Sequence, residues 1–284
     1  MIDRRTLIAA APLAAAWPAF AQDDAPLKAY ETATGGRIGL YAENLAAGKT
    51  LAWRPDERFV MCSTFKASLA GAVLHRVDSG AERLDRVIRF GPKDIQPYAP
   101  TAKAALDKGE LTVAQMCKAA VELSDNTCAN LLLEAIGGPA ALTAFWRVTG
   151  DDVSRLDHNE PLLNRSRPGN PEDTTTPKAM AKTIQALTLG RVLAPASRER
   201  ITDWMIACQT GANRLRAGLP KAWMIGDKTG NNGADACGDI AVAWRALGEP
   251  ILIACYVQGG KPTPAQQDAV FKQVGELVGR RLGA

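Results

Sequence analysis

The sequence predicts a fold of the α/β class (α+β type), in which an antiparallel sheet of about five strands is built from both chain ends and flanked by helices. An all-helical lobe is expected between the two parts of the sheet. Three observations lead to this prediction. Strand-like alternation occurs before residue 55, helical spacing of apolar residues runs from residue 63 to about 205, and strand patterns return after residue 221. A ligand site is expected in the cleft between the lobes, where such sites commonly occur.

The elements follow in order along the chain. A short helix over 27–34 precedes a hairpin, whose strands are expected at 37–43 and 51–54 around the turn 46–50. Apolar residues at three-to-four spacing then predict helices at 63–78, 112–122, 125–136, 138–148 and 177–189. Late strands at 222–228, 239–245 and 250–258 are followed by a closing helix over 264–281.

These elements divide the chain into two lobes. We expect an α/β lobe from residues 22–61 and 206–284, and an all-α lobe from residues 62–205. The all-α lobe contains the stretch 151–176, which is rich in Asp, Asn, Pro and Arg. A loop of this length in a compact domain is usually functional.

Residues 1–21 have the pattern of an export signal. Arg4 and Arg5 precede an apolar, alanine-rich stretch, and Ala19-Phe20-Ala21 fits a cleavage site. The adjacent arginines favour the twin-arginine route, with an ordinary secretory signal as the alternative. We therefore expect a periplasmic, monomeric protein with no stable membrane anchor.

Composition excludes several classes of function. A net charge of +4 without a long basic run does not predict nucleic-acid binding. Six cysteines would allow disulfides in an oxidising compartment, but their spacing matches no dense framework. Because no Cys-x-x-Cys occurs and only two histidines are present, neither a metal site nor a cofactor is expected.

Four short motifs carry the chemistry. Ser63-Thr-Phe-Lys66 places a nucleophile and a possible base three residues apart, on one face if the segment is helical. Alone, this match is more typical of a capping serine followed by a solvated lysine. Three more follow in order: Ser124-Asp125-Asn126, Glu160-Pro-Leu-Leu-Asn164 and Lys228-Thr229-Gly230. Singly, these too could be a helix cap, a solvated glutamate and a strand end.

Together the motifs resemble a known family. Ser-x-x-Lys, Ser-Asp-Asn and Lys-Thr-Gly in this order are the signature of class A β-lactamases and penicillin-binding proteins. The chain resembles a class A serine β-lactamase over nearly its whole length after the signal. Asn126-Thr-Cys-Ala-Asn130-Leu-Leu-Leu and Asp173-Thr-Thr-Thr-Pro177 add to the resemblance. It implies hydrolysis of penicillins and cephalosporins through a serine acyl-enzyme, and hence antibiotic resistance.

Such a reaction needs a nucleophile, a proton relay, oxyanion donors and an anion clamp. Ser63 would attack the carbonyl, and Lys66 is positioned to take or relay its proton. Ser124 could pass a proton to the leaving nitrogen. Lys228 and Thr229 would hold the substrate carboxylate, and the Lys228 ammonium would bias Lys66 towards its neutral form.

The resemblance implies further roles. The backbone N–H groups of Ser63 and Asn231 would form the oxyanion hole, and Asn126 would contact the substrate's side-chain amide. Glu160 and Asn164 would hold the hydrolytic water. The family leaves open whether Lys66 or Glu160 is the acylation base. Tyr98 resembles an aromatic that lines the cleft, although local packing would explain it equally well.

The anion clamp and the cysteines depart from the family pattern. Cys237 stands where many relatives carry an arginine, so we expect Arg214 to supply that charge, with Arg216 structural. Cys62 lacks the partner used by carbapenem-hydrolysing relatives, because Asn232 occupies that position. The sequence still allows a disulfide between Cys62 and Cys237. Cys117 fits half of a disulfide known in relatives, but its partner position holds alanine.

The loop carrying Glu160 also departs. His158 stands where relatives have an arginine that pairs with the acid at Asp173. Because imidazole loses its charge near neutrality, such a pair would depend on pH. We expect either a looser loop or compensation by Arg155.

Three alternatives remain. A D,D-peptidase shares three motifs but normally lacks the pair formed by Glu160 and Asn164. A non-hydrolysing β-lactam sensor would be acylated at Ser63 and stop there, and it usually has a membrane tether. A Ser-His-Asp esterase is disfavoured because no Gly-x-Ser-x-Gly occurs.

Overall fold

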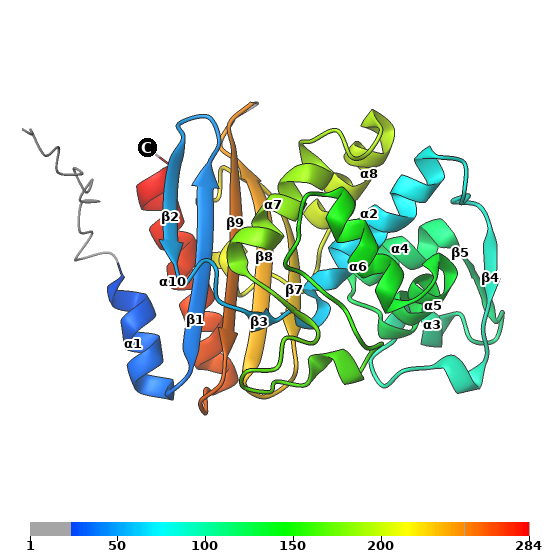
Figure 1. Ribbon diagram of the computed structural model, residues 1–284, viewed down its shortest axis with the longest axis horizontal. Helices are drawn as coiled ribbons and strands as arrows, with labels where there is room; N and C mark the ends of the chain where they lie inside the picture. Colours follow the sequence, from blue (N-terminus) through cyan, green and yellow to red (C-terminus); the bar gives the residue numbers. More distant parts are fainter. Residues whose placement is uncertain (1–23, 247, 284) are drawn as a thin grey trace, which may run out of the picture.

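The computed structural model describes residues 24–246 and 248–283, so the predicted export signal lies outside the described residues. One antiparallel sheet joins the two parts of the chain, with strand order β2-β1-β9-β8-β7 (Figure 1). Its strands are β1 (Arg37–Asn44), β2 (Lys49–Trp53), β7 (Met224–Asn231), β8 (Ala236–Trp244) and β9 (Pro250–Gln258). The early strand β1 pairs with the late strand β9 along its whole length, from Arg37 opposite Gln258 to Asn44 opposite Ile251. The predicted fold class is therefore confirmed.

The central strand β9 contributes to two hydrophobic cores, one on each face of the sheet. Ile251, Ile253 and Val257 pack under α1 (Ala25–Thr34) and α10 (Pro264–Leu282). Leu252 and Tyr256 point to the opposite face, which is covered by α7 (Pro177–Thr188). Side chains alternate along a strand, so a strand buried on both faces needs an almost continuous apolar run, as β9 has.

The segment between β2 and β7 is mostly helical. Its helices are η1 (Cys62–Thr64), α2 (Phe65–Asp78), η2 (Pro92–Asp94), α3 (Pro100–Ala104), α4 (Val113–Glu122), α5 (Asn126–Ile136), α6 (Pro139–Val148), η3 (Leu162–Asn164), α7, α8 (Pro195–Ile206) and α9 (Leu215–Gly218). Helix α2 lies at the centre and is buried from Phe65 to Leu74. Small residues allow this close packing: a Cβ on Gly71 would lie 2.8 Å from Leu187 Cδ1.

Two short strand pairs and the bounds of α8 were not predicted. The pair β4 (Val87–Arg89) and β5 (Glu110–Thr112) forms a small hairpin. In the second pair, β3 (Phe59–Val60) binds β6 (Thr174–Thr175), which attaches the end of the 151–176 loop to the chain just before Ser63. Strands of two or three residues are too short to show alternation in sequence.

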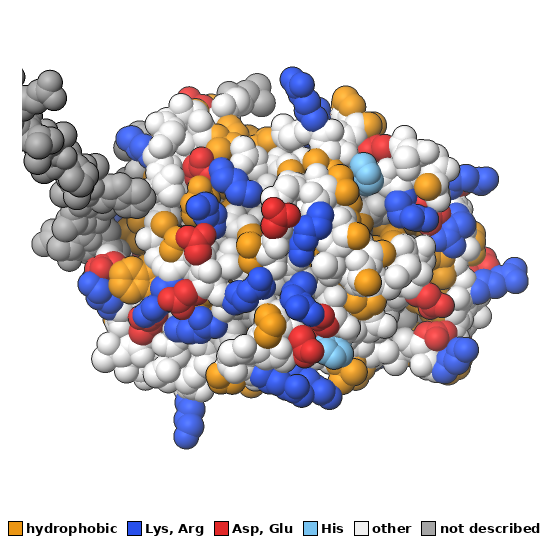
Figure 2. Space-filling model, in the orientation of Figure 1, with side chains coloured by type: hydrophobic (Ala, Val, Ile, Leu, Met, Phe, Trp, Pro, Cys, Tyr) orange, Lys and Arg blue, Asp and Glu red, His pale blue; other side chains and the backbone are white. Residues whose placement is uncertain are grey.

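Within residues 24–246 and 248–283, no single helix has the length and apolar composition to cross a membrane. Only α5 and α6 taken together reach that length, and they are bent by 74° at the break between them. On the face shown in Figure 2, basic and acidic side chains are interspersed.

Candidate active site

A cavity of about 410 Å³ lies between η1, the start of α5, the 151–176 loop and β7. Its volume is within the usual range for small-molecule sites. Ten of the twelve predicted site residues line it, together with Thr210 and Gly233: Ser63, Tyr98, Ser124, Asn126, Glu160, Asn164, Arg214, Thr229, Gly230 and Asn231. The remaining two, Lys66 and Lys228, are fully buried beside it. The structure therefore brings all four motifs together.

Ser63 and Lys66 meet at the beginning of the central helix. Ser63 lies in the 3₁₀ turn η1, and Lys66 is one turn further on, in the first turn of α2. Lys66 Nζ donates hydrogen bonds to Ser63 Oγ at 2.9 Å and to the backbone oxygen of Ser124 at 2.9 Å. It also contacts Asn126 Oδ1 and lies 3.1 Å from Glu160 Oε1. The lysine is thus surrounded by polar groups although it has no access to solvent.

Ser124 faces the cleft because its neighbour caps the helix. Asp125, rather than Ser124, is the N-cap of α5 and accepts the N–H of Cys128 at 2.9 Å. The Ser124 backbone has a left-handed φ of 60°, which is uncommon for a residue with a side chain. Ser124 Oγ accepts hydrogen bonds from Lys228 Nζ at 3.1 Å and Lys66 Nζ at 3.3 Å. One hydroxyl therefore connects the two lysines.

Burial lowers the pKa of both lysines. For Lys66 burial is the main cause, and the adjacent carboxylate of Glu160 opposes it. Burial, and to a smaller extent the positive charge of Lys66, lowers the pKa of Lys228 to about 8. Perturbed pKa values of this kind are typical of functional sites.

Glu160 reaches the serine from the 151–176 loop. Its Oε1 accepts the Ser63 hydroxyl at 3.0 Å, and its Oε2 accepts Asn164 Nδ2 at 2.5 Å. The backbone of Glu160 is held by Asn130 on α5: Asn130 Nδ2 donates to Glu160 O, and Glu160 N donates to Asn130 Oδ1, both at 2.9 Å. The peptide bond between Glu160 and Pro161 is cis.

Three residues at the site, Asn130, Thr210 and Gly233, were given no role by the sequence reasoning. Asn130 holds Glu160, and its signal was its place in the Asn126-to-Asn130 segment, one helical turn after Asn126. Thr210 lines the cavity, and its hydroxyl lies 2.6 Å from that of Thr229. The sequence signal for Thr210 was its place at the start of the segment that ends at the predicted site residue Arg214.

Gly230 lets β7 approach the nucleophile. A Cβ at this position would lie 2.8 Å from Met61 O and 2.8 Å from Ser63 N, so no larger residue fits. Strand β7 is at the edge of the sheet, and an edge strand leaves alternate N–H groups without a strand partner. The backbone at Gly230 thus comes close to the Ser63 amide, and Ser63 lies at the positive N-terminal end of α2.

Arg214 approaches the cavity from the α10 side of the sheet. Its Nη1 donates to Gly230 O at 2.9 Å and to Gly238 O at 3.1 Å, and its Nε pairs with Asp268 at 3.2 Å. Its guanidinium also lies 3.6 Å from Cys237 Sγ. The arginine thus contacts the residue that stands at the usual arginine position. The neighbouring Arg216 instead pairs with the buried Asp227.

The loop that carries Glu160 is fastened at Asp173. Its Oδ1 accepts the backbone N–H groups of Asp157 at 2.8 Å and His158 at 3.0 Å, and its Oδ2 contacts His158 Nδ1 at 2.7 Å. Arg155 does not replace His158 in this contact. It pairs with Asp157, whose carboxylate accepts the N–H of Asp173.

All six cysteines lie among the described residues, and all are buried free thiols. The Cys62–Cys237 bridge considered from sequence is therefore not formed. Cys62 Sγ instead contacts Ala236 O at 3.8 Å. Tyr98, by contrast, is 53% exposed at the cavity rim, and its backbone oxygen accepts the N–H of Asn126.

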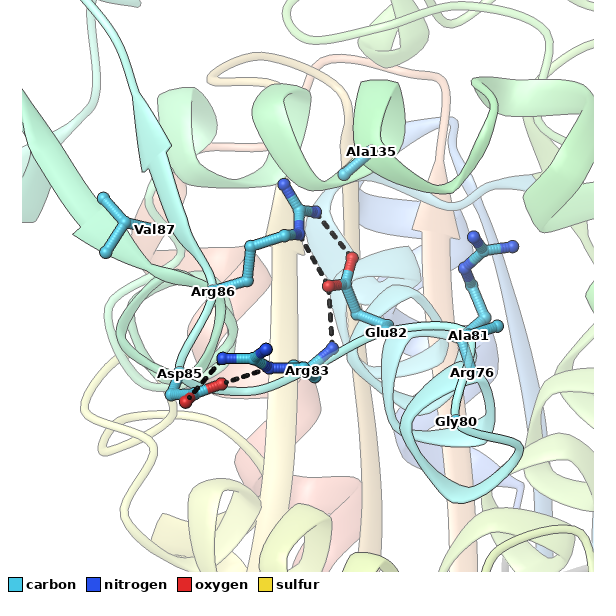
Figure 3. Close-up of a pocket in the computed structure, with 9 residues that line it drawn as sticks. All are labelled: Arg76, Gly80, Ala81, Glu82, Arg83, Asp85, Arg86, Val87 and Ala135. Atoms are coloured by element: carbon cyan, nitrogen blue, oxygen red, sulfur yellow. Dashed lines mark hydrogen bonds and ion pairs between the residues drawn. The ribbon is translucent and has the colours of Figure 1, made fainter.

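A larger depression of about 690 Å³ lies at the far end of α2 (Figure 3). It is lined by the ion pairs Glu82–Arg86 and Arg83–Asp85, and none of its lining residues is a serine, cysteine or lysine. Both of its carboxylates are engaged in ion pairs with arginines, and no general base lies beside a nucleophile as at Ser63. Within the described part of the chain, no group of three or more metal-binding side chains is found.

Known proteins match the chain over almost all of its described length. The model of the β-lactamase enzyme family matches residues 24–282. β-Lactamase L2 of Stenotrophomonas maltophilia is 45% identical over 256 residues, which cover 90% of this chain and 84% of that protein.

Solved structures agree. The class A β-lactamase of the last common ancestor of Gram-negative bacteria is 52% identical, with a TM-score of 0.87 over 91% of this chain and 98% of that one. A β-lactamase from Xanthomonas campestris pv. campestris is 45% identical, with a TM-score of 0.89 over 92% and 97% of the two chains. Such identity over so much of each chain is evidence of the family as well as the fold. The chain therefore belongs to the β-lactamase enzyme family and, within it, to the class A serine enzymes.

Proposed function

We propose that the chain hydrolyses the β-lactam ring of penicillins and cephalosporins through an acyl-enzyme on Ser63, and thereby confers antibiotic resistance. One observation carries the proposal: the Ser63 hydroxyl lies 2.9 Å from Lys66 Nζ and 3.0 Å from Glu160 Oε1. A serine attacks a carbonyl only when a neighbouring group accepts its proton. Two candidate acceptors touch this serine.

In the acylation step, Ser63 Oγ bonds to the β-lactam carbonyl carbon and its proton passes to Lys66 or Glu160. The backbone N–H groups of Ser63 and Asn231 stabilise the oxyanion. The carbon–nitrogen bond then breaks, and Ser124 gives its proton to the ring nitrogen. Because Ser124 Oγ accepts hydrogen bonds from both lysines, either can restore that proton.

In the deacylation step, Glu160 accepts a proton from a water molecule that attacks the ester carbon. The bond between that carbon and Ser63 Oγ then breaks, the acid product leaves, and the proton passes from Glu160 back to Ser63 Oγ. Asn164 holds the second carboxylate oxygen, which leaves Oε1 directed at the nucleophile. This arrangement distinguishes the proposal from its alternatives. A D,D-peptidase or a β-lactam sensor would be acylated at Ser63 without this pair to release it.

The far wall binds the substrate. Lys228, Thr229 and Arg214 attract its carboxylate, Asn126 contacts its side-chain amide, and Tyr98 forms the rim. Arg214 is the least usual member. Because Arg214→Ala removes a buried positive charge beside β7, we expect KM for benzylpenicillin to rise about tenfold, the size of effect of one lost charged hydrogen bond. Unchanged KM and kcat would show that Arg214 is only structural.

The proposed function is tested by nitrocefin turnover in the wild type and in Glu160→Ala, with mass spectrometry of the protein during the reaction. Steady-state turnover is expected in the wild type. In the variant, the mass of the acyl-enzyme should persist because its ester is no longer attacked. A wild type that is acylated once and never turns over would refute hydrolysis, and a normal rate in Glu160→Ala would refute the role of Glu160.

Three further features complete the proposal. Residues 1–21 are removed on export to the periplasm, and the rest acts there as a monomer without a membrane anchor. Residues 22–61 and 206–284 form an α/β lobe, and residues 62–205 form the all-α lobe. Mass spectrometry of the periplasmic protein would locate the cleavage site, and sedimentation would give its oligomeric state.

A further inference from the structure

The 151–176 loop is joined to the turn between β7 and β8 by side chains outside the four motifs. Ser166 Oγ donates a hydrogen bond to Asp235 Oδ2 at 2.8 Å. Asn232 Nδ2 donates to the other oxygen, Asp235 Oδ1, at 2.9 Å. The same Asn232 amide lies 3.4 Å from the backbone oxygen of Asn164. The Asp235 carboxylate thus binds Ser166 of the loop through one oxygen and Asn232 of its own turn through the other.

The turn itself is fixed to the body of the protein. Asn232 Oδ1 accepts the N–H groups of Ala234 and Ala236, which closes the turn. Asp235 O accepts the N–H of Gly259 at the end of β9, and Gln267 on α10 donates to Ala234 O, both at 3.0 Å. The turn is therefore a rigid support, and Ser166 fastens the loop to it.

We propose that Ser166, Asn232 and Asp235 form a latch that sets the width of the active-site cavity and so selects the size of the β-lactam side chain. The inference rests on the proposed function. Its geometry is simple: Asn164 lines the cavity two residues before Ser166, and Gly233 lines it two residues before Asp235. Because the turn is fixed, separation at the latch moves the loop wall at Asn164 away from the turn wall at Gly233.

The latch also affects the hydrolytic step. Asn164 is held by Glu160 on one side and by Asn232 on the other. When the latch opens, Asn164 is held from one side only, and the orientation of the Glu160 carboxylate becomes less fixed. A closed latch thus favours rapid turnover of substrates with compact side chains, and an open latch admits bulky ones at the expense of rate.

The first test is Ser166→Ala, assayed with benzylpenicillin and with the bulkier cefotaxime. We expect kcat for benzylpenicillin to fall and KM for cefotaxime to fall. The ratio of the two kcat/KM values should shift about tenfold towards cefotaxime, the size expected for one hydrogen bond to a charged group. If Ser166 were merely structural, its replacement would lower kcat/KM for both substrates by the same factor. That result would overturn the latch.

The second test is a double-mutant cycle with Asp235→Ala. If Ser166 acts through Asp235, the double variant should show the same substrate ratio as Asp235→Ala alone. Effects that multiply would mean that the two residues act independently, contrary to the proposal. A matched control exists at the far end of α2, where Ser197 Oγ donates to Asp78 Oδ1 at 2.6 Å. Ser197→Ala removes a similar serine–aspartate bond and should leave the ratio unchanged.

Hydrogen exchange separates failure of the latch from failure of the proposed function. Ser166→Ala and Asp235→Ala should each speed amide exchange in residues 162–170, whereas Ser197→Ala should not. This measurement does not depend on turnover. If the wild type hydrolyses no β-lactam, the proposed function fails. Amide exchange in the two variants still shows whether Ser166 and Asp235 fasten the loop. Unchanged exchange in residues 162–170 would overturn the latch in an active enzyme.

Discussion

The two sides of the Ser63 hydroxyl are constructed differently. On one side is a serine–lysine floor, which comes from regular elements and their ends: Ser63, Lys66, Ser124 and Lys228. On the other side Glu160 belongs to a loop, and the segment around it is positioned by side-chain contacts from Asn130, Asn164 and Asp173. Solvent is excluded from the floor, because both of its lysines are fully buried. The difference suggests that acylation depends on a rigid, desolvated floor and deacylation on a loop that can be adjusted.

The largest expected effect separates the two sides directly. Lys66→Met should slow acylation by benzylpenicillin about 10²- to 10⁴-fold, the usual contribution of a positioned base. Glu160→Gln should slow deacylation by a similar factor. Stopped-flow mixing with mass spectrometry measures each step.

The two variants should also differ in the species that accumulates. Lys66→Met should remain mostly free enzyme, whereas Glu160→Gln should collect as acyl-enzyme. Circular dichroism of Lys66→Met is the control for folding, because this change leaves Glu160 beside a buried apolar side chain. If both variants accumulated acyl-enzyme, the assignment of the floor to acylation would be wrong.

The floor should also impose a pH limit on substrate binding. Burial lowers the pKa of Lys228 to about 8, so its protonated fraction falls as the pH rises through that value. The ammonium attracts the substrate carboxylate, and kcat/KM should therefore fall about tenfold per pH unit above this pKa. Lys228→Arg keeps its charge and should move the limb to higher pH. If kcat/KM of the variant still fell above about pH 8, the fall would have to be assigned to a group other than Lys228.

Most of the floor could be predicted because its signals are local. Ser63 and Lys66 are three residues apart, and one helical turn brings them together wherever the helix lies. Strand β9 was equally visible, since its seven-residue apolar run, 251–257, lies between two turns and is shorter than a typical helix. That the sheet is built from both ends of the chain followed from the order of the predicted elements, whereas the pairing of β9 with β1 was shown only by the structure.

The supports of the loop could not be predicted, because they join segments that are distant in sequence. Asn130 and Glu160 are 30 residues apart, and Ser166 and Asp235 are 69 apart. No periodicity records such contacts. The substitution at His158 was recognised, but whether His158 or Arg155 would contact Asp173 depended on side-chain geometry. The roles of the site residues themselves stay predictions until the variants are measured.

A smaller effect is expected at Asn130, the support of Glu160 that lies outside the cavity lining. Asn130→Ala removes both partners of the Glu160 backbone, and an unsatisfied buried group costs about 1–3 kcal/mol. We expect kcat to fall about tenfold, since misplacing a catalytic group by a small distance is costly. The acylation rate should hardly change. Pre-steady-state bursts would measure this, and equal loss in both steps would place Asn130 in the floor instead.

The smallest effect is expected at His158, because Asp173 keeps two backbone donors when the imidazole is removed. His158→Ala should lower the free energy of unfolding by about 1 kcal/mol, the net value of one hydrogen bond. It should reduce the deacylation rate only a few-fold while leaving acylation intact. Asp173→Ala is the informative comparison: it removes all three contacts at once and should cost more in both measurements. Urea unfolding and single-turnover kinetics give the two quantities.

If His158→Ala were as damaging as Asp173→Ala, the imidazole would be the main fastening of the loop, and the backbone donors would contribute little. The loop would then be held by a single side chain, and its adjustability would depend on that one contact.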